Sequence, residues 1–196
     1  MERLITFSYY FLLFFSCSEQ MGCYNPKAIE FNDKAVELMQ RSEYDSALIL
    51  FDKAIEIDKI YYLPHSNKTT IYVRLKQLDK ALHESEMVVK KKPDLAEGWT
   101  LAGMLHDRLN DTLMAMKYYN KSIEIYDERI LDPKKKSHIA VNKFNRAVTL
   151  ILLGKEKEGK DEMLKLKLEN PDDLMIDEFI DMNKEEYIRQ IIDNEQ

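Results

Sequence analysis

The fold is decided by residues 96–129, which read AEGWTLAGMLHDRLNDTLMAMKYYNKSIEIYDER. Within this stretch Ala115 lies in a short segment, 112–116, that matches the segments 45–48 around Ala47 and 79–82 around Ala81, and the three alanines are separated by 34 and 34 residues. A fixed period of this length indicates stacked helical hairpins, because one hairpin cannot bury its own apolar face. The alternative is a nonrepetitive helical bundle in which the spacing arises by chance.

Large and small side chains recur at matching positions of the period. In the third unit Trp99 is followed by the small residues Ala102 and Gly103, and in the first unit Phe31 is followed by Ala35. Small residues let two helices approach closely, while large residues fill the space beside them. Each unit is therefore expected to contain two antiparallel amphipathic helices.

This pattern resembles the tetratricopeptide repeat (TPR). The resemblance implies an all-α fold, a right-handed α-solenoid of about four TPR-like helical hairpins with C-terminal capping helices. The array spans 28–173, and its units are expected at 28–61, 62–95, 96–129 and 140–173. The second unit departs from the family pattern, because Ser85 replaces an aromatic residue and Val88 a small one.

Residues 130–139 interrupt the period, because Ala115 and Gly159 are 44 residues apart. The interruption contains Pro133 followed by three lysines. Since proline disfavours an uninterrupted helix, the insertion either prolongs the second helix of the third hairpin or forms a loop.

Residues 174–196 carry apolar residues at helical spacing and are expected to form the capping helices. Asn183 with Glu186 is typical of a helix start. The fourth unit would present apolar side chains on its concave side, at Val141, Phe144, Val148 and Ile151. Either an external partner or the chain's own tail must cover them, and we favour the tail because it is covalently attached.

The N-terminus has the features of a targeting segment. Residues 4–15 read LITFSYYFLLFF, which is too short for a comfortable transmembrane helix and fits the apolar region of a signal peptide. Ser16-Cys17 then resembles the lipobox of bacterial lipoproteins, which implies removal of residues 1–16, lipidation of Cys17 and a linker over 17–27. Cys23 is the second candidate, and an ordinary secretory signal or an uncleaved anchor are further alternatives.

The same resemblance implies a lipid-anchored protein of the bacterial cell envelope. No aspartate follows Cys17 directly, which favours the outer membrane. Several acyl chains on one residue would give stable anchoring where a single chain would not.

Composition argues against several classes of function. Lys and Arg number 29 and Asp and Glu number 35, so the chain has a net charge of −6, which argues against nucleic acid as a partner. The four histidines are scattered without ligand spacing, and no glycine-rich phosphate loop occurs. We therefore predict no catalytic, cofactor-binding or metal-binding residues, no small-molecule substrate and no enzymatic activity.

The TPR resemblance implies a binding groove on the concave face formed by the first helix of each hairpin. Carried over by repeat position, the groove residues are Leu63, Ser66, Asn67, Thr70, Arg74, Thr100, Met104 and Arg108. One TPR subclass grips the C-terminal carboxylate of chaperones with cations and asparagines, but here only Asn67 matches. Asn32 and Glu97 stand where that subclass has cations, so this activity is not expected.

The sequence thus predicts a membrane-anchored TPR lipoprotein that acts as a protein-protein interaction scaffold or adaptor, with a protein or peptide in its groove. The alternatives are a structural or assembly subunit, or an accessory subunit of an envelope enzyme or transporter complex.

Overall fold

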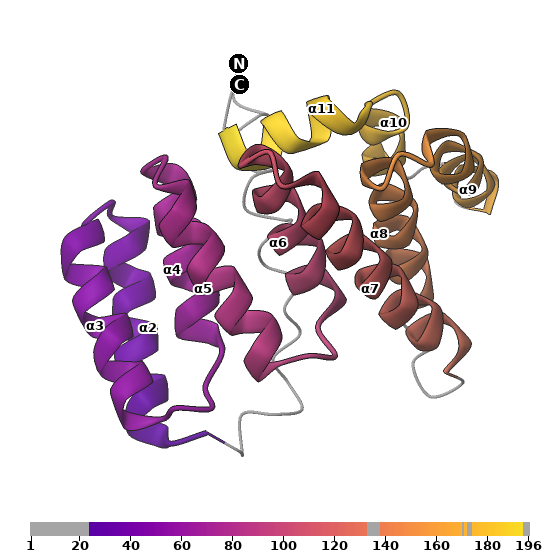
Figure 1. The fold of residues 1–196 in the computed structure, drawn as a ribbon. Helices are drawn as coiled ribbons and strands as arrows, with labels where there is room; N and C mark the ends of the chain where they lie inside the picture. The colour runs from indigo at the N-terminus through magenta and orange to yellow at the C-terminus, as the bar shows by residue number, and fades with distance from the viewer. Residues whose placement is uncertain (1–23, 133–137, 170, 172–173, 194–196) are drawn as a thin grey trace.

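The computed structural model describes residues 24–132, 138–169, 171 and 174–193, and every regular element in these ranges is helical. The elements in chain order are α2 (Pro26–Gln40), α3 (Tyr44–Ile57), α4 (Leu63–Arg74), α5 (Leu78–Lys91), α6 (Ala96–Arg108), α7 (Thr112–Leu131), α8 (Ile139–Leu152), α9 (Glu156–Glu169), α10 (Leu174–Phe179), α11 (Lys184–Ile188) and the π-helical turn η3 (Arg189–Asp193). Within the described residues α2 to α9 pair into four antiparallel hairpins that stack in order, and α11 lies across one edge of the stack (Figure 1). The predicted all-helical array of TPR-like hairpins is confirmed.

The predicted signal peptide, Cys17, Cys23 and the lysines of the insertion lie outside the described residues. Their interpretation stays a prediction. Among the helices that the structure describes, none is both long enough and apolar enough to cross a membrane.

The alanines that revealed the period sit at the helix contacts. Ala47, Ala81 and Ala115 lie on α3, α5 and α7, the second helices of their hairpins, and each is fully buried. A methyl group at this position lets the second helix approach the first, as in the cluster that Ala47 forms with Ala35. The repeat spacing is thus set by helix packing.

The turns inside the hairpins repeat the same backbone geometry. Ser42, Lys76, Asn110 and Gly154 follow the first helix of successive hairpins, and all four have φ between 57° and 91°. In each turn the N–H of the next residue donates to a carbonyl five residues earlier, as Glu43 does to Leu38. This left-handed ending satisfies carbonyl groups at the helix terminus and normally favours glycine, which only the fourth hairpin supplies.

The first two residues of the insertion, 130 and 131, continue the second helix of the third hairpin. Helix α7 has 20 residues, against 14 in α5, and continues to Leu131. Arg129 in its last turn pairs with Glu97 of α6 at 2.9 Å and donates to the carbonyl of Asp94 at 2.6 Å. These contacts hold the extra turns of α7 against the start of α6.

The closest backbone approach in the fourth hairpin gives a stability prediction. A Cβ atom on Gly159 of α9 would lie 2.5 Å from the carbonyl oxygen of Ala147 on α8 and 2.6 Å from Cγ1 of Ile151. Glycine to alanine inside a helix normally stabilises by about 1 kcal/mol, but overpacking against a backbone atom costs about 1–3 kcal/mol. We expect Gly159→Ala to lower the free energy of unfolding, measured by urea titration of the circular dichroism signal.

The matched control is Gly98→Ala on α6. The nearest atom to a Cβ there is Cγ1 of Val88 at 3.2 Å, which belongs to a side chain that can adjust. This substitution should leave the stability unchanged or raise it slightly. Equal gains from both substitutions would show that α8 and α9 are not in this close contact.

Candidate functional site

The side chains predicted for the second unit share one face of α4. All five are partly exposed, and they lie along that face from the first to the last turn of the helix: Leu63, Ser66, Asn67, Thr70 and Arg74. Because α-helical positions three, four, seven and eleven residues apart fall on one side, this row forms a continuous strip. The structure therefore brings these predicted residues together.

Helix α2 supports this strip. The amide nitrogen of Asn67 donates to the side-chain oxygen of Asn32 on α2 at 3.0 Å, between positions 35 residues apart. At the far end of the strip the Arg74 guanidinium donates to the Tyr44 hydroxyl at 3.5 Å, and this contact lowers the pKa of Tyr44. We call the row on α4 the α2–α4 surface, because the buried Asn32 of α2 supports it from one side.

Two predicted groove residues of the third unit are corrected by the structure. Thr100 is buried, and its hydroxyl lies 2.7 Å from that of Ser122 on α7 and 3.1 Å from that of Thr149 on α8. Met104 is fully buried in a cluster that includes Val148. Both side chains belong to the core, because the fourth hairpin and the C-terminal tail cover this part of α6.

Arg108, the last residue of the predicted groove, is held by the tail. Its Nε atom donates to the carboxylate of Asp193 at 3.1 Å, and a second nitrogen of the guanidinium contacts the same carboxylate. A further bond of 3.1 Å runs to Glu185. Arg108 is thus part of an intramolecular contact rather than of an open surface.

The C-terminal tail covers the apolar face of the fourth unit, as the sequence favoured. The ring of Phe144 on α8 meets that of Phe179 edge-on at 5.8 Å between centroids, and Phe179 stacks on Tyr187 at 5.7 Å. The Tyr187 hydroxyl donates to the carbonyl of Phe179 at 2.7 Å. Of the predicted groove, the α2–α4 surface is the part that the structure leaves accessible.

A buried charge network lies behind the α2–α4 surface. Lys68 on α4 reaches Asp52 on α3 and Glu84 on α5, each at 2.7 Å, and Glu84 also lies 2.6 Å from Nδ1 of His65. Burial disfavours the charged form of both Glu84 and Lys68, but their hydrogen bonds prevail. As a result the pKa of Glu84 lies below its usual value and that of Lys68 above it. The network fixes α4 between its two neighbours.

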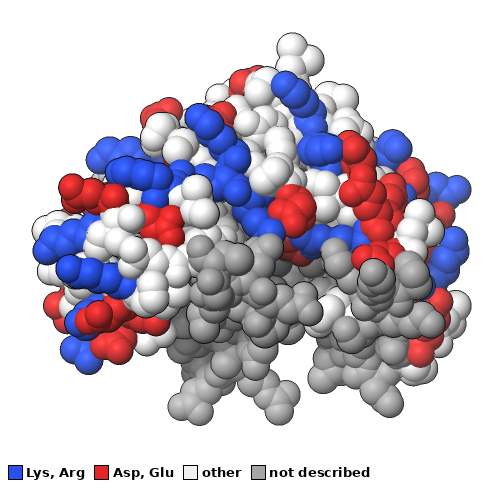
Figure 2. Space-filling view, turned by 90° about the horizontal axis from the view of Figure 1, so that it is seen from below, with Lys and Arg blue, Asp and Glu red and all other residues white. Residues whose placement is uncertain are grey.

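The surface charge is mixed in sign. Figure 2 shows Lys and Arg side chains interleaved with Asp and Glu over the visible face. Binding of a polyanion such as nucleic acid depends on clustered cations. The face in this view does not provide them.

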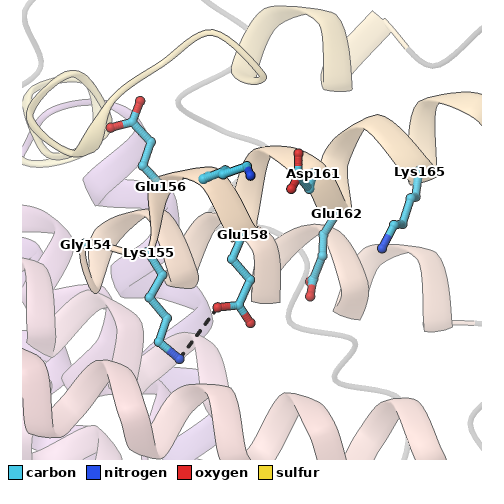
Figure 3. Close-up of a pocket in the computed structure, with 8 residues that line it drawn as sticks. Gly154, Lys155, Glu156, Glu158, Asp161, Glu162 and Lys165 are labelled. Atoms are coloured by element: carbon cyan, nitrogen blue, oxygen red, sulfur yellow. Dashed lines mark ion pairs between the residues drawn. The ribbon is translucent and has the colours of Figure 1, made fainter.

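A surface depression of about 620 Å³ lies along α9, lined by Gly154, Lys155, Glu156, Lys157, Glu158, Asp161, Glu162 and Lys165. Its side chains do not converge, since Lys155, just before α9, meets Glu158 on one side while Glu156 and Asp161 point to the other (Figure 3). Among the described residues no group of three or more His, Cys, Asp or Glu side chains could hold a metal ion.

Part of this chain is similar to a known repeat family. The profile of the tetratricopeptide repeat matches residues 96–129. The chain is 30% identical to heat shock protein STI1 of Saccharomyces cerevisiae over 99 residues, which is 50% of this chain and 17% of that protein. It is 25% identical over 129 residues to the Hsp70-Hsp90 organising protein of Plasmodium falciparum, 65% of this chain and 22% of that one. The chain therefore spans about a fifth of the length of these relatives.

Solved structures share the fold. PilW, a widely conserved type IV pilus biogenesis factor, superimposes with a TM-score of 0.55 at 23% identity, over 75% of this chain and 64% of PilW. YrrB, described as a TPR protein with an unusual peptide-binding site, has a TM-score of 0.53 at 17% identity, over 76% of this chain and 72% of YrrB. The similarity is to a stack of helical hairpins and extends over most of the described residues.

Proposed function

We propose that this chain is a protein-interaction adaptor that receives a segment of a protein partner along the α2–α4 surface. The observation that carries the proposal is the accessible strip on α4, where amide, hydroxyl and guanidinium groups lie along one helix face. The inner faces of the third and fourth units are already covered by the tail. The TPR-profile match and the relatives named as organising proteins support an adaptor role.

The chemistry of the strip suggests what it would bind. The Asn67 amide, whose nitrogen donates one hydrogen bond to Asn32, has a second N–H and an oxygen that can bond a peptide backbone, and Arg74 offers a charged donor for a carboxylate. Leu63 adds apolar contact at the other end of the strip. We infer a partner segment that is extended and carries an acidic residue.

The chaperone C-terminus is not the partner that these residues favour. A relative of this chain is named Hsp70-Hsp90 organising protein, but the resemblance of this chain to the TPR subclass that grips chaperone carboxylates fails at its cationic positions. Asn32 is an amide, and Glu97 is a carboxylate paired with Arg129 at 2.9 Å. A second carboxylate brought to Glu97 would be repelled.

The proposal is tested by cross-linking the protein to its partner in the cells that produce it. The full chain with Asn67→Ala and Arg74→Glu should capture its partner at least about tenfold less efficiently than the wild type, since the charge-assisted bond of Arg74 alone is worth about 1.5–3 kcal/mol. Lys117→Glu on α7, which is exposed and also replaces a cation by a carboxylate, is the control and should have no effect. Equal capture by all three proteins would rule out the α2–α4 surface.

We also propose that Cys17 carries a lipid anchor and that the protein is located in the bacterial envelope, as the N-terminal sequence suggests. Cys17→Ser should release the protein from membranes and abolish labelling by a radioactive fatty acid, while Cys23→Ser should do neither. Membrane fractionation and labelling measure both effects. The reverse result would move the modified residue to Cys23, and retention in both variants would refute the lipoprotein assignment.

A further inference from the structure

The last turns of the tail occupy a slot between two first helices of the array. Turn η3 contacts both α4 and α6, and Ile188 and Ile192 are buried in the same cluster as Val73 and Met104. Figure 1 shows α11 running across the end of α6 toward α4, along one edge of the stack. The tail therefore reaches past the fourth unit, which it was expected to cover, to the second and third.

Charged groups close the end of this slot. The Lys76 ammonium donates to the backbone carbonyl of Asp193, and the Arg108 guanidinium binds the carboxylate of the same residue. Lys184 of the tail pairs in turn with Asp107 of α6 at 2.6 Å. An apolar floor bounded by cations that grip one acidic residue is a recognition surface for an amphipathic acidic helix.

We propose that this slot, lined by Val73, Lys76, Met104 and Arg108, is a second binding site, and that residues 183–193 are its tethered occupant. Its external ligand is an amphipathic helix of a protein partner, with apolar residues in the pattern of Tyr187, Ile188, Ile191 and Ile192 and a carboxylate next in sequence. The proposal rests on the adaptor function, because it adds a second contact for a protein partner.

The tail is bound in a way that permits exchange. Helix α11 and turn η3 have five residues each, and helices so short are not stable by themselves, so their order depends on the slot. The side-chain oxygen of Gln190 is buried without a hydrogen-bond partner, which weakens the docked state.

Displacement of the tail would uncover apolar side chains. A vacated slot would expose Val73 and Met104 beside the fourth unit, and an apolar patch of this kind calls for a partner. While the tail is docked, the apparent affinity for an external helix falls in proportion to the fraction of open slots. Release of the tail should therefore raise binding of a helix supplied in trans.

The probe is a fluorescent peptide with the sequence of residues 183–193, NKEEYIRQIID. The full chain with Ile188→Glu and Ile192→Glu, which cannot return its own tail to the slot, should bind this peptide at least about tenfold more tightly than the wild type. The matched control carries Leu164→Glu and Leu168→Glu, the same chemical change at exposed positions of α9, and should bind like the wild type. Fluorescence anisotropy measures all three affinities.

Two further measurements test whether the slot is a binding site. Adding Arg108→Ala to the released-tail chain should weaken peptide binding about tenfold, because the carboxylate loses its charged partner. In the wild type, excess peptide should accelerate hydrogen exchange of the amides of residues 183–193, a measurement that does not depend on how the double variant folds. Unchanged exchange, or peptide affinity indifferent to Arg108→Ala, would overturn the proposal.

The outcome is separable from that of the adaptor proposal. Asn67→Ala with Arg74→Glu should not change peptide binding by the released-tail chain, since neither residue lines the slot. If the partner-capture test contradicts its expected result while the peptide binds as expected, the slot is supported and the α2–α4 surface is refuted. If the partner-capture test gives its expected result while the peptide does not bind, the α2–α4 surface is supported and the slot is refuted.

Discussion

Replacing Phe144 by aspartate is expected to lower the free energy of unfolding by more than about 4 kcal/mol. Phe144 is buried between α8 and the tail, where its ring meets that of Phe179 at 5.8 Å. An aspartate there would lose the ring contacts and place a carboxylate in an apolar cluster without a charged partner. The effect should therefore exceed the loss of packing alone.

A second substitution separates the loss of packing from the cost of burying a carboxylate. Phe144→Leu keeps an apolar side chain and should cost less than about 1.5 kcal/mol. Urea titration of both variants, followed by circular dichroism, gives the comparison. If the aspartate variant were no less stable than the leucine variant, the tail would not cover α8 in solution.

Removal of the Glu84 carboxylate should be nearly as damaging. Glu84 and Lys68 have side chains only 9% and 10% exposed, and they are joined at 2.7 Å. Breaking a buried ion pair by deleting one partner leaves the other charge poorly solvated and typically costs about 3–5 kcal/mol. We expect Glu84→Ala to lower the stability by this amount at neutral pH, because Lys68 then keeps only the exposed Asp52.

This loss should depend on pH in a defined direction. The pKa of Glu84 in the folded protein lies below its usual value of 4.5, so its stabilising contribution is present above that pH and disappears as the pH falls through the folded pKa. The difference between wild type and Glu84→Ala should therefore shrink in acid. Glu30→Ala removes a carboxylate from an exposed pair with Lys34 and is the control, for which little loss is expected at either pH. Equal losses for the two variants at neutral pH would contradict the buried network.

The repeat could be predicted from sequence because its determinants are local. Ala47, Ala81 and Ala115 mark the same helix contact in successive hairpins, where only a small side chain lets the two helices approach closely. The helix start in the tail could also be predicted, because Asn183 and Glu186 satisfy each other's backbone groups within three residues. Signals of this kind depend on residues within a single hairpin or a single turn.

The state of the groove could not be predicted in the same way. Thr100 and Met104 occupy concave positions of the third unit, but their burial depends on α8 and on a tail more than 70 residues further along the chain. The network around Glu84 was missed for a related reason. Charged residues on an amphipathic helix usually face solvent, and only the packing of α3, α4 and α5 turns these inward. Ser85, in place of an expected aromatic residue, and Val88, in place of a small one, were the local hints that this unit is unusual.

The path of the tail also affects which parts of the molecule unfold together. In a simple stack each hairpin contacts only its neighbours, so unfolding can spread from either end. Here Asp193 is joined to Lys76, 117 residues earlier, which ties the last three hairpins into one closed unit. These hairpins should gain and lose structure together, while α2 and α3 lie outside the closure and can fray alone. The α2–α4 surface straddles that boundary, so a partner seated on it would couple the fraying hairpin to the cooperative block.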